Sequence, residues 1–124
     1  MTQQGMYKGD CFIRAIETIT KEPKLLFCFS YITIRYKDLS TGEIKEDKNV
    51  LHAWCEGIAN KGGKVCIDLS NNMQVIIFKK YYYKEHKIDS NKVIRQNYLE
   101  VIECLKENNN ICGSWCKEML ENKK

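Results

Sequence analysis

The stretch GDCFIRAIETITKEPKLLFCFSYITIRYK, residues 9–37, predicts a helix followed directly by a strand, and the expected fold is built on this pair of elements. Asp10 is a candidate N-cap, and Pro23 cannot continue a helix. Between them, apolar residues recur at the spacing of one helical face: Phe12, Ile13, Ala15, Ile16 and Ile19. Residues 25–37 are rich in Phe, Ile, Tyr and Thr, which is typical of a strand.

Strand patterns and turn signals continue downstream. Residues 39–49 are charged and contain Thr41-Gly42, which predicts a turn or flexible loop. Further strands are expected over residues 50–58, 64–69 and 74–83, and helices over residues 90–107 and 111–120. The sequence thus predicts an α+β fold. An N-terminal helix packs on an antiparallel sheet of about four strands, and C-terminal helices cover one face.

Composition and charge favour one ordinary globular domain. The chain has 124 residues, 44% hydrophobic and 29% charged, and we expect a single domain over residues 1–124. Its core would span about residues 5–84 and its helical tail about residues 85–124. The net charge of +4 comes without a basic block or a known nucleic-acid motif, so nucleic acid is not the expected partner. Tyr81-Tyr82-Tyr83 is interpreted as part of an edge strand rather than as a base-stacking platform.

The seven cysteines are expected to be mostly free thiols. Residues 1–10 show no signal-peptide pattern, and the apolar-rich stretch 24–36 is too short and too interrupted to span a bilayer. These observations predict a soluble, cytoplasmic protein without a membrane partner, in a compartment that keeps thiols reduced. Three cysteines of the tail lack a CxxC pair and a fourth ligand, so neither a metal nor another cofactor is expected: Cys104, Cys112 and Cys116.

Cys11 is the candidate nucleophile. It stands where the first helix begins, and the partial positive charge of a helix N-terminus favours the reactive thiolate. The backbone N–H of Cys11 could also stabilise an oxyanion. His52 lies in an apolar strand and is the candidate base, since the other histidine, His86, lies in a lysine-rich segment. A buried apolar Cys and a core His are the structural alternatives.

Asp68 is the candidate third member of a triad. It ends the apolar run Val65-Cys66-Ile67, where a carboxylate is costly unless it is paired. A loop centred near Asn60 would make His52 and Asp68 direct cross-strand neighbours, whereas a tight turn at Lys61-Gly62 would instead set Asn71 opposite His52. We favour the first register. A strand-ending Asp that accepts turn hydrogen bonds is the structural alternative.

Three motifs in this order resemble the transglutaminase-like and papain-like cysteine hydrolases. Gly9-Asp10-Cys11-Phe12-Ile13-Arg14-Ala15 is similar to their nucleophile helix. Leu51-His52-Ala53-Trp54-Cys55-Glu56 is similar to their histidine strand, and Val65-Cys66-Ile67-Asp68-Leu69-Ser70 to their aspartate strand. The resemblance covers about residues 5–72 and extends to the compact B-type peptidases of lasso-peptide biosynthesis. It implies the papain-like core and the triad Cys11, His52 and Asp68.

The resemblance implies one further site residue, and position in the sequence suggests others. Papain-like relatives often place a Gln ahead of the nucleophile as a second oxyanion donor. Gln3, Gln4 and Tyr7 lie upstream of Cys11, and we favour Gln4. Trp54 and Tyr7 are candidates for lining a substrate groove, although core packing explains Trp54 equally well. Trp115 is expected to anchor the final helix.

The expected activity is therefore that of a small cysteine peptidase or amidase that acts on a protein or peptide through a thioester. Two alternatives stay open. An amine instead of water as the acceptor would make the chain an acyl transferase, or transglutaminase. A catalytically inactive chain of the same fold would serve as a protein-binding module.

Overall fold

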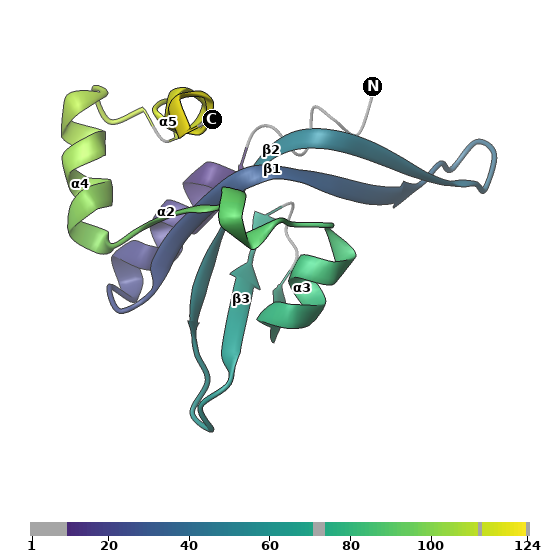
Figure 1. The fold of residues 1–124 in the computed structure, drawn as a ribbon, viewed down its shortest axis with the longest axis horizontal. Coiled ribbons are helices and arrows are strands. Elements are labelled where there is room, and N and C mark those ends of the chain that lie inside the picture. Colours follow the sequence, from purple (N-terminus) through teal and green to yellow (C-terminus); the bar gives the residue numbers. More distant parts are fainter. Residues whose placement is uncertain (1–9, 71–73, 112, 124) are drawn as a thin grey trace.

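The computed structural model describes residues 10–70, 74–111 and 113–123 (Figure 1). It contains helices, strands and one short 3₁₀ helix in this order: α2 (Cys11–Lys21), β1 (Leu26–Lys37), β2 (Ile44–Ile58), β3 (Lys64–Asp68), β4 (Val75–Phe78), α3 (Lys79–Glu85), η2 (Ser90–Lys92), β5 (Ile94–Gln96), α4 (Tyr98–Glu107) and α5 (Cys116–Lys123). The α+β class expected from the sequence is thus observed in the described part of the chain.

One antiparallel sheet organises the molecule, with strand order β4-β3-β2-β1-β5. The first four strands form the expected meander. The expected count of about four strands is one too few, because β5 pairs with the outer edge of β1, where Phe27 lies opposite Gln96. In Figure 1 the far ends of β1 and β2 run out as a long arm, and the β2–β3 hairpin points away from it.

The sheet has a hydrophobic cluster on each face. On one face α2, α4 and α5 pack over Phe27, Phe29 and Cys55. On the other face Tyr82 of α3 packs with Trp54 and Cys66. This double cover explains why most of β1 is buried and why its sequence is almost continuously apolar.

The helix α2 forms as predicted and fixes the position of Cys11. Its buried residues are Cys11, Ala15, Ile16 and Ile19, which lie on the face turned to the sheet. The Cys55 thiol donates a hydrogen bond of 3.2 Å to the Ala15 carbonyl and so ties α2 to β2. Asp10 is the N-cap residue, but its side chain makes no capping hydrogen bond.

The strand predicted over residues 74–83 is wrong in its second half. β4 ends at Phe78, and α3 begins at Lys79. Three consecutive tyrosines favour a strand locally, but burial decides otherwise. Tyr82 is 1% exposed and Tyr81 is 54% exposed, so the helix turns one ring into the core and leaves its neighbour outside.

The helix predicted over residues 90–107 is also wrong in its first half. Residues 90–92 form η2 and residues 94–96 form β5, so α4 begins only at Tyr98. Asn97 and Glu100 form a capping box, with hydrogen bonds of 2.9 Å in both directions. This signal was present in the sequence. The final helix predicted over residues 111–120 is shifted to Cys116–Lys123, and the buried Trp115 precedes it, as expected for its anchor.

The loop predicted over residues 39–49 is shorter than expected. β2 begins at Ile44, which pairs with Lys37, and the two strands continue through an irregular register near Ile32. Asn49 has a φ of 57° at this irregularity. Pairing continues beyond this bulge, so the charged residues 44–48 belong to β2, although the sequence pattern predicts a loop there.

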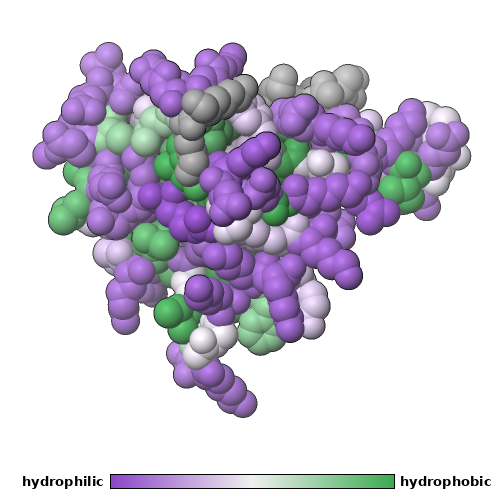
Figure 2. Space-filling model, in the orientation of Figure 1, coloured by the Kyte–Doolittle hydropathy of each residue, from purple (hydrophilic) through white to green (hydrophobic). Residues whose placement is uncertain are grey.

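The surface is mostly hydrophilic on the face shown in Figure 2, with apolar side chains in small separate groups. Within the described ranges, no helix has the length and apolar character needed to cross a membrane.

Candidate active site

Cys11 is the first residue of α2 and is 2% exposed. The backbone N–H groups of a first helical turn have no partners within the helix. Since the Asp10 side chain makes no capping bond, it does not occupy these donors. Asp10 instead lies 3.8 Å from Arg14, whose backbone N–H closes the first helical turn on the Asp10 carbonyl at 2.8 Å. The Cys11 side chain therefore sits at the positive end of an eleven-residue helix.

His52 and Asp68 are in direct contact. His52 Nε2 lies 2.8 Å from Asp68 Oδ2, and both residues are buried. The predicted cross-strand pairing is nevertheless wrong in register. β2 and β3 pair Cys55 with Ile67, and one step further this register sets Asp68 opposite Trp54. His52 and Asp68 are diagonal neighbours on one sheet face, a separation that these side chains can bridge.

The Asp68 carboxylate accepts four hydrogen bonds. Oδ2 accepts from His52 and, at 2.7 Å, from the Tyr82 hydroxyl. Oδ1 accepts from the backbone N–H and the hydroxyl of Ser70, at 3.0 and 2.7 Å. The turn hydrogen bonds that we considered as an alternative to a catalytic role are thus present together with the histidine contact. Both carboxylate oxygens have fixed partners.

The surroundings of Asp68 and of His52 favour the charged form of each side chain. Burial alone would raise the pKa of Asp68, but its hydrogen bonds with His52, Ser70 and Tyr82 hold that pKa well below its ordinary value. Burial alone would lower the pKa of His52, but its interactions with Asp68 and Cys11 outweigh burial and raise the pKa to about 9. At neutral pH the contact is therefore an imidazolium–carboxylate pair.

The second ring nitrogen of His52, Nδ1, does not contact Asp68. Nδ1 is buried and has no formed hydrogen bond among the described residues. The Cys11 side chain nevertheless lies near enough to raise the pKa of the ring. Cys11 is thus a neighbour of the imidazole without a well-aligned hydrogen bond to it. Loose contacts of this kind are common in enzymes without bound substrate.

The other described cysteines have different surroundings. Burial raises the pKa of Cys55 and of Cys66 to about 12, and it also raises the pKa values of Cys28 and Cys116. Cys104 is half-buried. All six described cysteines are free thiols. In the described part of the chain, no three His, Cys, Asp or Glu side chains come together as a possible metal site.

The remaining candidates fare differently. Trp54 is 1% exposed and stacks on His52 with ring centroids 6.3 Å apart, so it belongs to the core and does not line an open groove. Gln4 and Tyr7 lie outside the described residues, as does Cys112 of the zinc alternative.

The sequence interpretation missed Tyr82 and His86, because α3 was assigned to a strand. The Tyr82 hydroxyl contacts Asp68 directly. The His86 ring packs edge-to-face with the Tyr82 ring, with centroids 4.6 Å apart. Their spacing of four residues, which places two side chains on one helix face, was the available signal.

A second buried carboxylate lies on the same sheet face. Glu56 lies 3.1 Å from Arg95 Nε and 3.5 Å from Lys79 Nζ, and it accepts a hydrogen bond of 3.0 Å from the Trp54 indole. The Tyr83 hydroxyl also donates to it. Burial would raise the pKa of Glu56, but these donors and the charge of Arg95 lower it.

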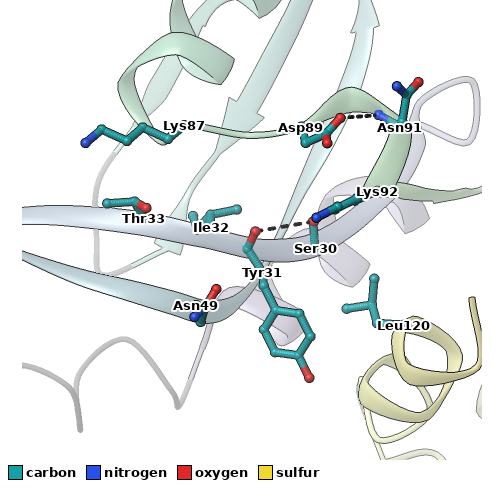
Figure 3. Close-up of a pocket in the computed structure, with 10 residues that line it drawn as sticks. All are labelled: Ser30, Tyr31, Ile32, Thr33, Asn49, Lys87, Asp89, Asn91, Lys92 and Leu120. Carbon is teal, nitrogen blue, oxygen red and sulfur yellow. Dashed lines mark hydrogen bonds between the residues drawn. The ribbon is translucent and has the colours of Figure 1, made fainter. Parts of the chain in front are cut away.

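A pocket of about 730 Å³ opens beside β1, between η2, α5 and the irregular part of β2 (Figure 3). Lys92 extends from η2 toward Ser30, and Leu120 closes the side of α5. Ser30 is the cross-strand partner of His52. Adjacent strands lie about 5 Å apart, so the pocket begins one strand away from the imidazole.

Comparison of the chain with family models, with curated proteins and with solved structures finds no match.

Proposed function

We propose that this chain is a small cysteine hydrolase, a peptidase or amidase, with Cys11, His52 and Asp68 as its catalytic triad. The observation that supports this proposal most is the buried His52–Asp68 pair, whose remaining nitrogen has no formed hydrogen bond and neighbours a thiol at a helix N-terminus. A buried imidazolium N–H without an acceptor is costly. A Cys11 thiolate would supply that acceptor.

Each residue then has a defined role. The Cys11 thiolate attacks the carbonyl carbon of an amide, and the backbone N–H of Cys11 stabilises the oxyanion. His52 gives the Nδ1 proton to the leaving amine as the C–N bond breaks, which leaves a thioester. Water then attacks the thioester while His52 takes up its proton, and the acid and the thiolate are released. Asp68 orients the imidazole and stabilises its charged form.

The substrate we propose is a protein or peptide, bound in the neighbouring pocket, which the triad residues themselves do not line. The pocket beside Ser30 is lined by strand backbone and by Asn49 and Lys92, groups that suit the amides and carboxylates of a peptide. An amine in place of water would make the same chemistry an acyl transfer, and nothing in the triad distinguishes the two acceptors.

A non-catalytic binding module is the second candidate, and burial favours it. Cys11 and His52 are each 2% exposed, so neither side chain is open to a substrate in this structure. In this case the His52–Asp68 pair would serve stability alone.

Limiting iodoacetamide at neutral pH, followed by mass-spectrometric mapping, separates these candidates. Among the described cysteines, accessibility alone favours Cys104, because it is half-buried whereas Cys11 is buried. A hydrolase predicts that Cys11 is alkylated first, through thiolate character, and that His52→Ala removes the preference. Faster labelling of Cys104 than of Cys11 in the wild-type protein would reject the catalytic proposal in favour of the binding module.

A further inference from the structure

Asp68 Oδ2 is shared between two donors that come from different elements. His52 of β2 approaches it at 2.8 Å, and Tyr82 of α3 approaches it at 2.7 Å. Ser70 occupies the other oxygen with two hydrogen bonds. The orientation of the carboxylate therefore depends on Ser70 from one side and on Tyr82 from the other.

Tyr82 is itself held firmly. It is 1% exposed, and its ring packs on Trp54 at 5.6 Å and on His86 at 4.6 Å between centroids. His86 fixes this end of α3 to β1, since His86 Nδ1 lies 3.0 Å from the Thr33 carbonyl and the Thr33 N–H donates to the His86 carbonyl at 2.9 Å. The hydroxyl consequently reaches Asp68 from a fixed direction.

The hydroxyl has no other role in the described structure. Its single hydrogen bond is the one to Asp68, whereas a buried tyrosine needed only for packing could be a phenylalanine. The hydroxyl of the next residue, Tyr83, donates a hydrogen bond to Glu56 instead. Each tyrosine of this pair thus supports one buried carboxylate.

We propose that Tyr82 is a positioning residue for the candidate triad: by donating to the oxygen that faces His52, its hydroxyl fixes the direction of the Asp68 carboxylate and limits how strongly that carboxylate stabilises the charged imidazole. As a general acid, His52 must release its Nδ1 proton during the reaction, so a carboxylate that stabilises the imidazolium too strongly through Nε2 would slow that release. The proposal deepens the proposed function, and it rests on that function only for the use made of the proton.

Electrostatics agree with this geometry. Burial and the charge of Asp68 raise the pKa of Tyr82 well above its ordinary value, so the phenol is a neutral donor throughout the physiological range. Its hydrogen bond in turn lowers the pKa of Asp68. His86, whose ring packs against the Tyr82 ring, has a pKa that is lowered by burial and by the charge of His52.

The test is an NMR titration of the His52 ring in the wild-type protein, in Tyr82→Phe and in the matched control Tyr81→Phe. Tyr81 lies on the same helix but is exposed. Removing a donor from Oδ2 concentrates its charge on His52, so Tyr82→Phe should raise the His52 midpoint by about 0.3–1 pH unit, with Tyr81→Phe unchanged. A midpoint that stays in place, or that falls, overturns the proposal.

A second variant keeps the test decisive if Tyr82→Phe does not fold. 3-Fluorotyrosine placed at position 82 by codon suppression keeps the ring and strengthens the donor, so the His52 midpoint should fall; no change, or a rise, counts against the proposal. The titration needs no substrate. A shifted midpoint together with an unreactive Cys11 would reject the proposed function and keep the role of Tyr82, whereas a reactive Cys11 with an unmoved midpoint would do the opposite.

Discussion

Asp68 and Glu56 are two buried carboxylates on one face of the sheet, and they are neutralised differently. Glu56 forms ion pairs with two basic side chains, Arg95 and Lys79. Asp68 instead pairs with His52, whose second ring nitrogen forms no hydrogen bond among the described residues. A permanent cation can only hold structure, whereas an imidazolium can also give up its proton. This difference is why we propose a structural role for Glu56 and a role in the triad for Asp68.

Removal of the Glu56 carboxylate should have the largest effect on stability. Glu56→Ala leaves Arg95 and the Tyr83 hydroxyl without their buried acceptor, and losing one partner of a buried pair costs about 3–5 kcal/mol. Urea unfolding measures this. The control Glu46→Ala breaks an exposed contact with Lys87, which should cost less than about 1 kcal/mol. Equal losses in the two variants would show that the Glu56 network is not a structural centre.

Alkaline pH should weaken the Asp68 pair and leave the Glu56 network intact. Because the pKa of His52 is raised in the folded protein, its protonation contributes stability that is complete below the ordinary value of 6.5 and is lost as pH rises through about 9. The loss is on the order of 3 kcal/mol, at about 1.4 kcal/mol per pKa unit. Unfolding free energies between neutral pH and pH 10 check this, and His52→Gln should remove the alkaline loss.

Acidic pH has the opposite sign and affects both carboxylates. The pKa values of Asp68 and Glu56 are lowered on folding, so their contributions are present above the ordinary values and disappear as pH falls through the lowered ones. Acid therefore destabilises both networks, whereas alkali distinguishes between them.

Asp68→Asn should have a smaller effect on stability and a clear effect on His52. The amide still accepts a hydrogen bond from Tyr82 but loses the charge, for a cost of about 1–3 kcal/mol. Only Cys11 then opposes the effect of burial at His52, so its pKa should fall well below about 9. NMR titration of the ring measures this shift. Glu56→Gln serves as the control and should leave the His52 titration unchanged. A His52 midpoint that stays near 9 in Asp68→Asn would mean that the carboxylate does not hold the ring.

Local patterns predict the first half of this fold well. The helix from Cys11 to Lys21 has its apolar spacing, its N-cap residue and Pro23 all in agreement, and residues 26–37 are strongly β-forming. The contact of His52 with Asp68 could be anticipated because strand alternation puts them on one face. The exact register could not, since glycines near residue 62 permit several turn lengths.

The second half depends on contacts that are distant in sequence. Tyr82 is buried because it contacts Trp54 and Asp68 on the sheet. No local sequence pattern specifies these two residues as its neighbours. Ile94 belongs to β5 because the edge of β1 is free to pair, although its spacing from Tyr98 also fits a helix. Tertiary pairing overrides local propensity in both places.

The most direct test of the central claim is the pH dependence of Cys11 alkylation by iodoacetamide, in the wild-type protein and in His52→Ala. If the His52–Asp68 pair supports a Cys11 thiolate, the wild-type rate should stay high well below the free-thiol midpoint of about 8.5, and the His52→Ala profile should move to that midpoint. Superimposable profiles centred near that value would show that Cys11 is an ordinary buried cysteine and that the pair on which the proposed hydrolase depends does not act on it.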